Sequence, residues 1–101
     1  MADFVKVATL AELPPGTAKA VEVGGNSVAL YNVGGTVFAT ANTCPHRGGP
    51  LGEGELNQDV ITCPWHGFQY DVTTGKCRTN PALSVGCHAV RIEGQNVLVE
   101  A

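Results

Sequence analysis

Three glycine-bearing pairs divide much of this 101-residue chain into short apolar runs, and their spacing limits the folds that the chain can adopt. The pairs are Gly24-Gly25, Gly34-Gly35 and Gly94-Gln95, and short runs rich in valine flank them. A two-residue hairpin loop needs positive φ angles, which glycine adopts without steric cost. The pairs therefore predict antiparallel hairpins, built from strands near 17–23, 26–33, 36–41, 88–93 and 96–100.

The N-terminal segment continues this pattern. A short run over 4–8 predicts one more strand. Thr9 and Glu12 have the spacing of a capping box, and Pro14 follows them, so we expect a single helical turn that ends before the proline. So little helix does not allow an alternation of strands and helices, and the sequence predicts an all-β fold.

The middle of the chain has a different composition. Residues 42–83 hold three of the four cysteines, two of the three histidines and four of the six prolines. Their glycines and prolines predict loops joined by short strands at 53–56, 60–62 and 68–71. We therefore expect one domain over 1–101, in which a β base of about 1–41 and 84–101 carries a loop-rich subdomain at about 42–83.

Charge and hydropathy limit the partners and the cellular compartment that we expect for this chain. Six Lys and Arg against nine Asp and Glu give a net charge of −3 without a basic run, so nucleic acid is not an expected partner. No apolar run approaches the ~18 to 20 residues that a bilayer crossing requires, and the N-terminus lacks the apolar core of a signal peptide. We expect a soluble, cytoplasmic protein with no membrane contact. Since disulfides are rare in the cytosol, the cysteines point toward metal binding.

Two short segments carry the chemistry of the chain. Cys44-Pro45-His46 and Cys63-Pro64-Trp65-His66 each offer one thiolate and one imidazole, in the pattern C-x-H-x16-C-x2-H. A zinc finger places its two cysteines in one half and its two histidines in the other, so that each half grips the same ion. Interleaved ligands suit a centre of two metals instead, and a mononuclear zinc site is the alternative.

This motif, with its surrounding glycines and prolines, resembles that of the Rieske-type [2Fe–2S] ferredoxins, and the resemblance covers essentially the whole chain. It implies a Rieske-like fold, in which an antiparallel β-sandwich or barrel base carries an inserted cluster-binding subdomain. It also implies one [2Fe–2S] cluster, with Cys44 and Cys63 on one iron and His46 and His66 on the other. The zinc-binding alternative would be colourless and would give no EPR signal.

The same resemblance implies a function in electron transfer. The chain is similar to ferredoxin components that carry electrons from a flavin-dependent NAD(P)H reductase to the terminal oxygenase of bacterial aromatic-ring dioxygenase systems, and such a component is not itself an enzyme. The small Rieske subunit of an NAD(P)H-dependent nitrite reductase is the alternative. The number of histidines excludes a catalytic oxygenase subunit. Its mononuclear iron needs two further histidines and a carboxylate, and only His88 remains after His46 and His66.

Electron transfer requires the cluster to approach the redox centre of a partner. We expect transient docking at the edge formed by His46 and His66, and the acidic charge of the chain favours partners with basic patches. The residues expected to rim this edge are Pro45, Arg47, Pro64, Trp65, Gly67 and Pro81. The resemblance further implies that Asn80-Pro81-Ala82 forms a loop over the cluster.

The remaining candidates have structural interpretations. Cys77 and Cys87 have no partner at metal-ligand spacing, and we expect both to be structural, as buried small thiols. His88 opens a predicted strand and is expected to be a surface or hydrogen-bonded histidine. Gly67 and the run Gly48-Gly49-Pro50 are expected to let backbone N–H groups approach the cluster sulfurs closely.

The neighbours of the ligands predict a low reduction potential. In respiratory Rieske subunits two further cysteines form a disulfide, at positions that resemble Gly49 and Trp65 here. Those subunits also have a serine that donates to a bridging sulfide, where this chain has Phe68, and a tyrosine donor that resembles Tyr70.

If the missing donor strengthens by ~1–2 kcal/mol on reduction, its loss lowers a one-electron potential by on the order of 40–90 mV. We expect voltammetry to give a midpoint near about −150 mV, in the lower part of the Rieske range. A midpoint well above zero would contradict this expectation.

Overall fold

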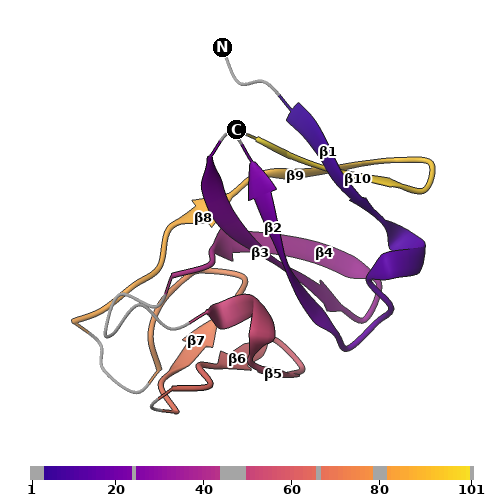
Figure 1. The fold of residues 1–101 in the computed structure, drawn as a ribbon. Helices are drawn as coiled ribbons and strands as arrows, with labels where there is room; N and C mark the ends of the chain where they lie inside the picture. The colour runs from indigo at the N-terminus through magenta and orange to yellow at the C-terminus, as the bar shows by residue number, and fades with distance from the viewer. Residues whose placement is uncertain (1–3, 24, 44–49, 66, 79–81, 101) are drawn as a thin grey trace.

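The computed structural model describes residues 4–23, 25–43, 50–65, 67–78 and 82–100, which form three antiparallel sheets (Figure 1). The terminal sheet has the order β1 (Phe4–Thr9), β10 (Asn96–Glu100) and β9 (Val90–Glu93). The central sheet has the order β2 (Ala18–Val23), β3 (Asn26–Val33), β4 (Thr36–Ala41) and β8 (Cys87–His88). The small sheet has the order β5 (Glu55–Asn57), β6 (Val60–Thr62) and β7 (Gln69–Asp71). The all-β class and the antiparallel arrangement predicted from the sequence are confirmed.

Helical structure in these ranges consists of two short 3-10 turns, η1 (Leu10–Glu12) and η2 (Leu51–Glu53). Among the residues that the structure describes, no helix is long and apolar enough to span a membrane. The turn predicted at 9–12 is therefore present as η1. Its expected cap is wrong, because the Thr9 side chain makes no capping hydrogen bond.

The glycines of these pairs that the structure describes lie in the turns between paired strands, as predicted, and Gly24 lies outside the described residues. Val33 pairs with Thr36 across the turn between β3 and β4, and the β9–β10 hairpin has a turn of the same length. Gly34 and Gly35 have φ angles of +60° and +101°, which other residues rarely adopt. The strands predicted at 17–23, 26–33, 36–41 and 96–100 are confirmed to within one residue.

The strand predicted at 88–93 is two strands in the structure. β8 pairs with β4 of the central sheet, where His88 lies opposite Ala39. β9 pairs instead with β10 of the terminal sheet, where Val90 lies opposite Val99. The chain changes sheet at Ala89. The sequence pattern did not reveal this change, because both halves keep the spacing of an extended strand.

The short strands of the loop-rich region are close to their predicted positions. The strand at 60–62 is confirmed as β6, and the strand at 68–71 is present as β7 from Gln69. The strand predicted at 53–56 begins only at Glu55, because the preceding residues form η2.

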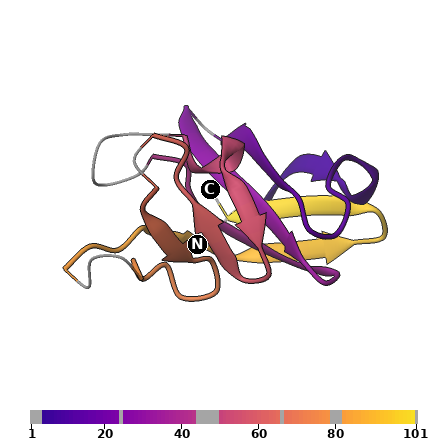
Figure 2. The same cartoon turned by 90° about the horizontal axis from the view of Figure 1, so that it is seen from below.

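β3 lies between two hydrophobic cores and is buried on both faces. The terminal core consists of Ala8, Leu13, Val23, Val28, Leu30, Val37, Ala39, Val97 and Val99. The loop-side core consists of Ala29, Tyr31, Leu51, Ile61, Cys63, Tyr70, Val72, Cys77 and Val85. Successive residues of β3 alternate between the two cores, as the pleat of a strand requires. Both views of the molecule show the central sheet between the other two sheets (Figures 1 and 2).

The small sheet is joined to the central sheet by η2, which packs closely against β2. Gly52 of η2 is buried. A Cβ atom at this position would lie 2.8 Å from the backbone nitrogen of Ala20 and 2.9 Å from its Cα atom. Backbone atoms cannot move aside without shifting the strand, so the contact between η2 and β2 requires a glycine here.

Gly52→Ala is expected to destabilise the protein by about 1–3 kcal/mol, the usual effect of overpacking. Gly86→Ala is the matched control, because a Cβ atom there meets nothing within 4 Å and its φ lies outside the left-handed region. We expect the control to change the free energy of unfolding by less than about 0.5 kcal/mol. Urea unfolding of both variants measures the difference, and equal stabilities would contradict the close contact at Gly52.

Candidate metal centre

The first predicted ligand segment lies between two residues that pair with each other. Thr43 and Pro50 form an isolated β-bridge. Beside it, the backbone N–H of Leu51 donates a 2.7 Å hydrogen bond to the carbonyl oxygen of Asn42. The chain therefore leaves the end of β4 and returns to the same place. The intervening residues 44–49, with the predicted ligands Cys44 and His46, lie outside the described residues.

The second ligand segment is a tight turn that begins at Cys63. The Cys63 N–H donates a 2.7 Å hydrogen bond to the carbonyl oxygen of Phe68, and the Gly67 N–H donates a 3.1 Å bond to the carbonyl oxygen of Cys63. Gly67 has a φ of +73°, so this turn favours glycine. Pro64 and Trp65 are exposed on the turn. The predicted ligand His66 lies outside the described residues.

A third closed loop follows β7. The Cys77 N–H donates a 3.1 Å hydrogen bond to the carbonyl oxygen of Leu83, and the Arg78 N–H donates a 2.6 Å bond to the carbonyl oxygen of Gln69. The predicted proline loop, Asn80-Pro81-Ala82, lies between Arg78 and Leu83 in the sequence. Ala82 is described and exposed, whereas the other two residues lie outside the described residues.

The bases of these three loops meet in the loop-side core. Leu51 follows the first loop, and Cys63 and Cys77 begin the second and the third. All three residues are buried in the same core, and Phe68 and Leu83 pack against it. Close packing fixes such side chains relative to one another. Segments that are distant in the sequence are therefore anchored side by side.

The described part of the predicted ligand set fits an iron–sulfur cluster. Cys63 is only 2% exposed, and it lines a hollow of about 540 Å³. Gly54 and Gly67 line the same hollow and add no side-chain bulk. A thiolate in such a place is the soft donor that iron–sulfur clusters use. Within the described ranges no group of three or more Cys, His, Asp or Glu side chains gathers, and three of the four predicted ligands lie outside those ranges.

Two positions identified from the resemblance belong to or pack against the same core as Cys63. Tyr70 of β7 is fully buried in the loop-side core and pairs with Ile61 of β6. Phe68 is partly buried against the same core. A serine hydroxyl is absent from that position, as the sequence states, and the hydrogen bond from Tyr70 to a cluster cysteine stays a prediction.

The two cysteines outside the motif differ in their surroundings. Cys77 is 5% exposed in the loop-side core, which agrees with the structural role expected for it. Cys87 is exposed on β8, so its expected burial is wrong. Partial desolvation raises the pKa of the Cys87 thiol, and the charge of Asp71 raises it further. The thiol is therefore protonated at neutral pH, and a protonated thiol is a poor nucleophile.

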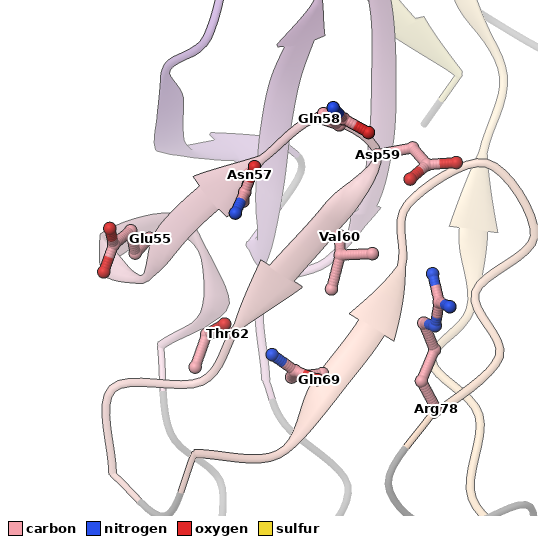
Figure 3. Close-up of a pocket in the computed structure, with 8 residues that line it drawn as sticks. All are labelled: Glu55, Asn57, Gln58, Asp59, Val60, Thr62, Gln69 and Arg78. Carbon is pink, nitrogen blue, oxygen red and sulfur yellow. The ribbon is translucent and has the colours of Figure 1, made fainter.

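A second hollow, of about 470 Å³, lies on the outer face of the small sheet. Its lining consists of Glu55, Asn57, Gln58, Asp59, Val60, Thr62, Gln69 and Arg78 (Figure 3). In register across the three strands, Glu55, Thr62 and Gln69 form one row, and the neighbouring row contributes to the loop-side core. Strand alternation thus turns polar side chains outward here. Cys63 does not line this hollow, but Glu55 and Thr62 line both hollows, so the second hollow adjoins the candidate centre.

The motif pattern did not reveal the asparagine at the base of the first loop. Asn42 is 8% exposed, and its side-chain oxygen accepts a 2.7 Å hydrogen bond from the N–H of Gly52. The signal that could have found it is an asparagine placed directly after a predicted strand and two residues before a predicted ligand. Asparagine side chains at such chain reversals often bond to nearby backbone groups.

Comparison with known proteins identifies the family. The chain matches the Rieske [2Fe-2S] domain over residues 3–97. The ferredoxin component of biphenyl 2,3-dioxygenase from Rhodococcus jostii (strain RHA1) is 38% identical over 98 residues, which cover 96% of this chain and 92% of that protein. A chain in the structure of the complex of reduced oxygenase and oxidized ferredoxin in carbazole 1,9a-dioxygenase is 36% identical with a TM-score of 0.88, and the match covers 96% of this chain and 92% of that one.

The chain belongs to the Rieske [2Fe–2S] domain family. Its cofactor is therefore a [2Fe–2S] cluster of the Rieske type, which two cysteine and two histidine side chains bind. A putative NADH-dependent nitrite reductase small subunit from Mycobacterium tuberculosis has a TM-score of 0.91 over 100% of this chain and 96% of that chain. Its sequence is 21% identical, so this likeness concerns the fold alone.

Proposed function

We propose that this chain is a one-electron carrier that passes electrons from a flavin-dependent NAD(P)H reductase to a terminal oxygenase. One observation carries the proposal. All four motif positions, Cys44, His46, Cys63 and His66, are present in a chain that matches a dioxygenase ferredoxin component over nearly all of both lengths. These four residues are the cluster ligands in this proposal. The chain is then an electron-transfer component of a larger system and not an enzyme by itself.

The arrangement of a loop-rich subdomain on a β base supports this function. The loops that carry the ligands belong to a cluster-binding subdomain at about 42–83, and the β base at about 1–41 and 84–101 supports it. When bound, a cluster of this type takes up and releases one electron. The chain itself holds the Cys63 backbone by hydrogen bonds at its N–H and its carbonyl oxygen. The tip of that turn can therefore contact a partner without moving Cys63.

The surface around this turn supports docking of a basic partner. Trp65 is 57% exposed, a large value for an aromatic side chain, and it lies between the proposed ligands Cys63 and His66. Exposed aromatic residues often anchor protein interfaces. Residues 48–75 include four acidic residues and no lysine or arginine. Two of the acids, Glu53 and Glu55, line the same hollow as Cys63 and place negative charge beside the candidate centre.

The nitrite reductase alternative has less support. The solved structures of that description with a high TM-score are only 21% identical to this chain. The dioxygenase ferredoxin components reach 32% to 38% identity over nearly the whole chain. We therefore retain one proposed function.

Substitution of the ligands tests the proposal directly. His46→Ala and His66→Ala are each expected to abolish the EPR signal of the dithionite-reduced protein, because each removes a ligand of one iron. His88→Ala is the matched control, since it removes the third histidine, which is half-buried on β8. We expect it to retain the signal. A colourless, EPR-silent wild type after anaerobic reconstitution with iron and sulfide, or an unchanged signal in either ligand variant, would contradict the proposal.

Docking at the cluster loops predicts a second outcome. Trp65→Ala is expected to lower the second-order rate constant for reduction by the native reductase by about tenfold, as loss of an interface anchor commonly does. Ile92→Ala is the control, because Ile92 is 43% exposed but lies on β9 of the terminal sheet. Stopped-flow absorbance measures both rates.

Ionic strength gives an independent check on the same interface. Attraction between the acidic face and a basic partner is screened by salt, so reduction of the wild type should slow as ionic strength rises. Rates that do not depend on salt would count against electrostatic steering, and equal rates for the two variants would show that docking does not use Trp65.

A further inference from the structure

Asn42 connects three parts of the chain that the sequence keeps apart. It directly follows β4, and it is 8% exposed. Its backbone N–H donates a 3.0 Å hydrogen bond to the carbonyl oxygen of Ser27, and its Nδ2 donates a 3.0 Å bond to the Ser27 hydroxyl oxygen. Both bonds fasten the end of β4 to the start of β3.

The acceptor groups of the same residue hold the far side of the first loop. The Asn42 carbonyl oxygen accepts from the Leu51 N–H at 2.7 Å, and its Oδ1 accepts from the Gly52 N–H at 2.7 Å. Leu51 is fully buried in the loop-side core, and Gly52 packs against Ala20. Asn42 therefore ties β3 to both ends of the six-residue segment 44–49.

The Asn42 side chain is the replaceable part of this connection. Its Oδ1 accepts the hydrogen bond of the buried Gly52 N–H, and a buried N–H without a partner is strongly unfavourable. Leu51 keeps its bond in any variant, because the acceptor is a backbone carbonyl. Substitution of Asn42 thus removes the hydrogen bond of the Gly52 N–H and leaves that of the Leu51 N–H in place.

We propose that Asn42 is a positioning residue, which sets the separation of the two ends of the segment that carries Cys44 and His46. The inference rests on the proposed ligation by those two residues. Asn42 does not touch the cluster in this proposal. It acts through η2 and the Thr43–Pro50 bridge, so that the first pair of ligands has a fixed position relative to Cys63.

The chain offers a close internal control in Asn32. This residue is 4% exposed, and its side chain likewise donates one hydrogen bond and accepts one. Its Nδ2 donates a 2.8 Å hydrogen bond to the carbonyl oxygen of Leu13, and its Oδ1 accepts a 2.8 Å bond from the N–H of Gly35. Asn32 lies at the other end of β3, beside the hairpin turn. Asn32→Ala therefore removes the same number of side-chain hydrogen bonds without touching the first loop.

The test compares cluster loss with stability in the holoprotein. Asn42→Ala is expected to speed the bleaching of the visible absorbance under a ferrous chelator at least fivefold relative to Asn32→Ala, while urea unfolding gives similar midpoints for the two variants. Hydrogen exchange provides a readout that does not depend on the cluster. In Asn42→Ala we expect the Gly52 amide to exchange at least tenfold faster, whereas in Asn32→Ala the Gly35 amide changes instead.

A milder variant covers the case in which Asn42→Ala does not fold. Ser27→Ala removes only the acceptor of the Asn42 Nδ2 group. We expect its bleaching rate to lie between those of the wild type and Asn42→Ala. If Asn42→Ala does not fold, we expect the Ser27→Ala rate to exceed that of Asn32→Ala. Bleaching rates of the Asn42 and Ser27 variants no higher than that of Asn32→Ala would overturn the positioning role. That result would leave the proposed function intact, because only the ligand variants His46→Ala and His66→Ala test the ligation itself.

Discussion

Burial of β3 on both faces is the constraint on which the rest of the structure depends. Val28 and Leu30 lie in the terminal core, and Ala29 and Tyr31 lie in the loop-side core. All four residues are at most 1% exposed. Since side chains alternate along a strand, a shift of one residue in register would exchange the two sets and disturb both cores at once. The support of the cluster loops and the packing of the chain ends are thus coupled through one strand.

The loop-side core explains how a region rich in glycine and proline can hold a metal centre. Backbone hydrogen bonds close each loop at its base, and Leu51, Cys63 and Cys77 bury those bases in one cluster of side chains. Trp65, by contrast, is exposed at the tip of its turn. A carrier benefits from this combination, because its ligands need a fixed position while its surface must meet a partner and leave it.

Much of the fold follows from local features of the sequence. The hairpin turns at Gly34-Gly35 and Gly94-Gln95 are predictable because positive φ favours glycine. The division of the predicted strand 88–93 was not predictable, since the exchange of partners at Ala89 depends on β4 and β10, which lie elsewhere in the sequence. The turn η2 escaped prediction for a similar reason, because its position depends on close contact with β2.

For the candidate centre, the sequence alone determined the residue types of the motif and their spacing, and with them the family, because those depend on the chemistry of two short segments. Only the tertiary structure decided that Cys63 and Cys77 share one core while Cys87 is exposed. It alone also assigned Asn42 to the base of the first loop. Burial and hydrogen bonding of these residues depend on segments distant along the chain, and a local pattern of residues carries no record of which segments will meet.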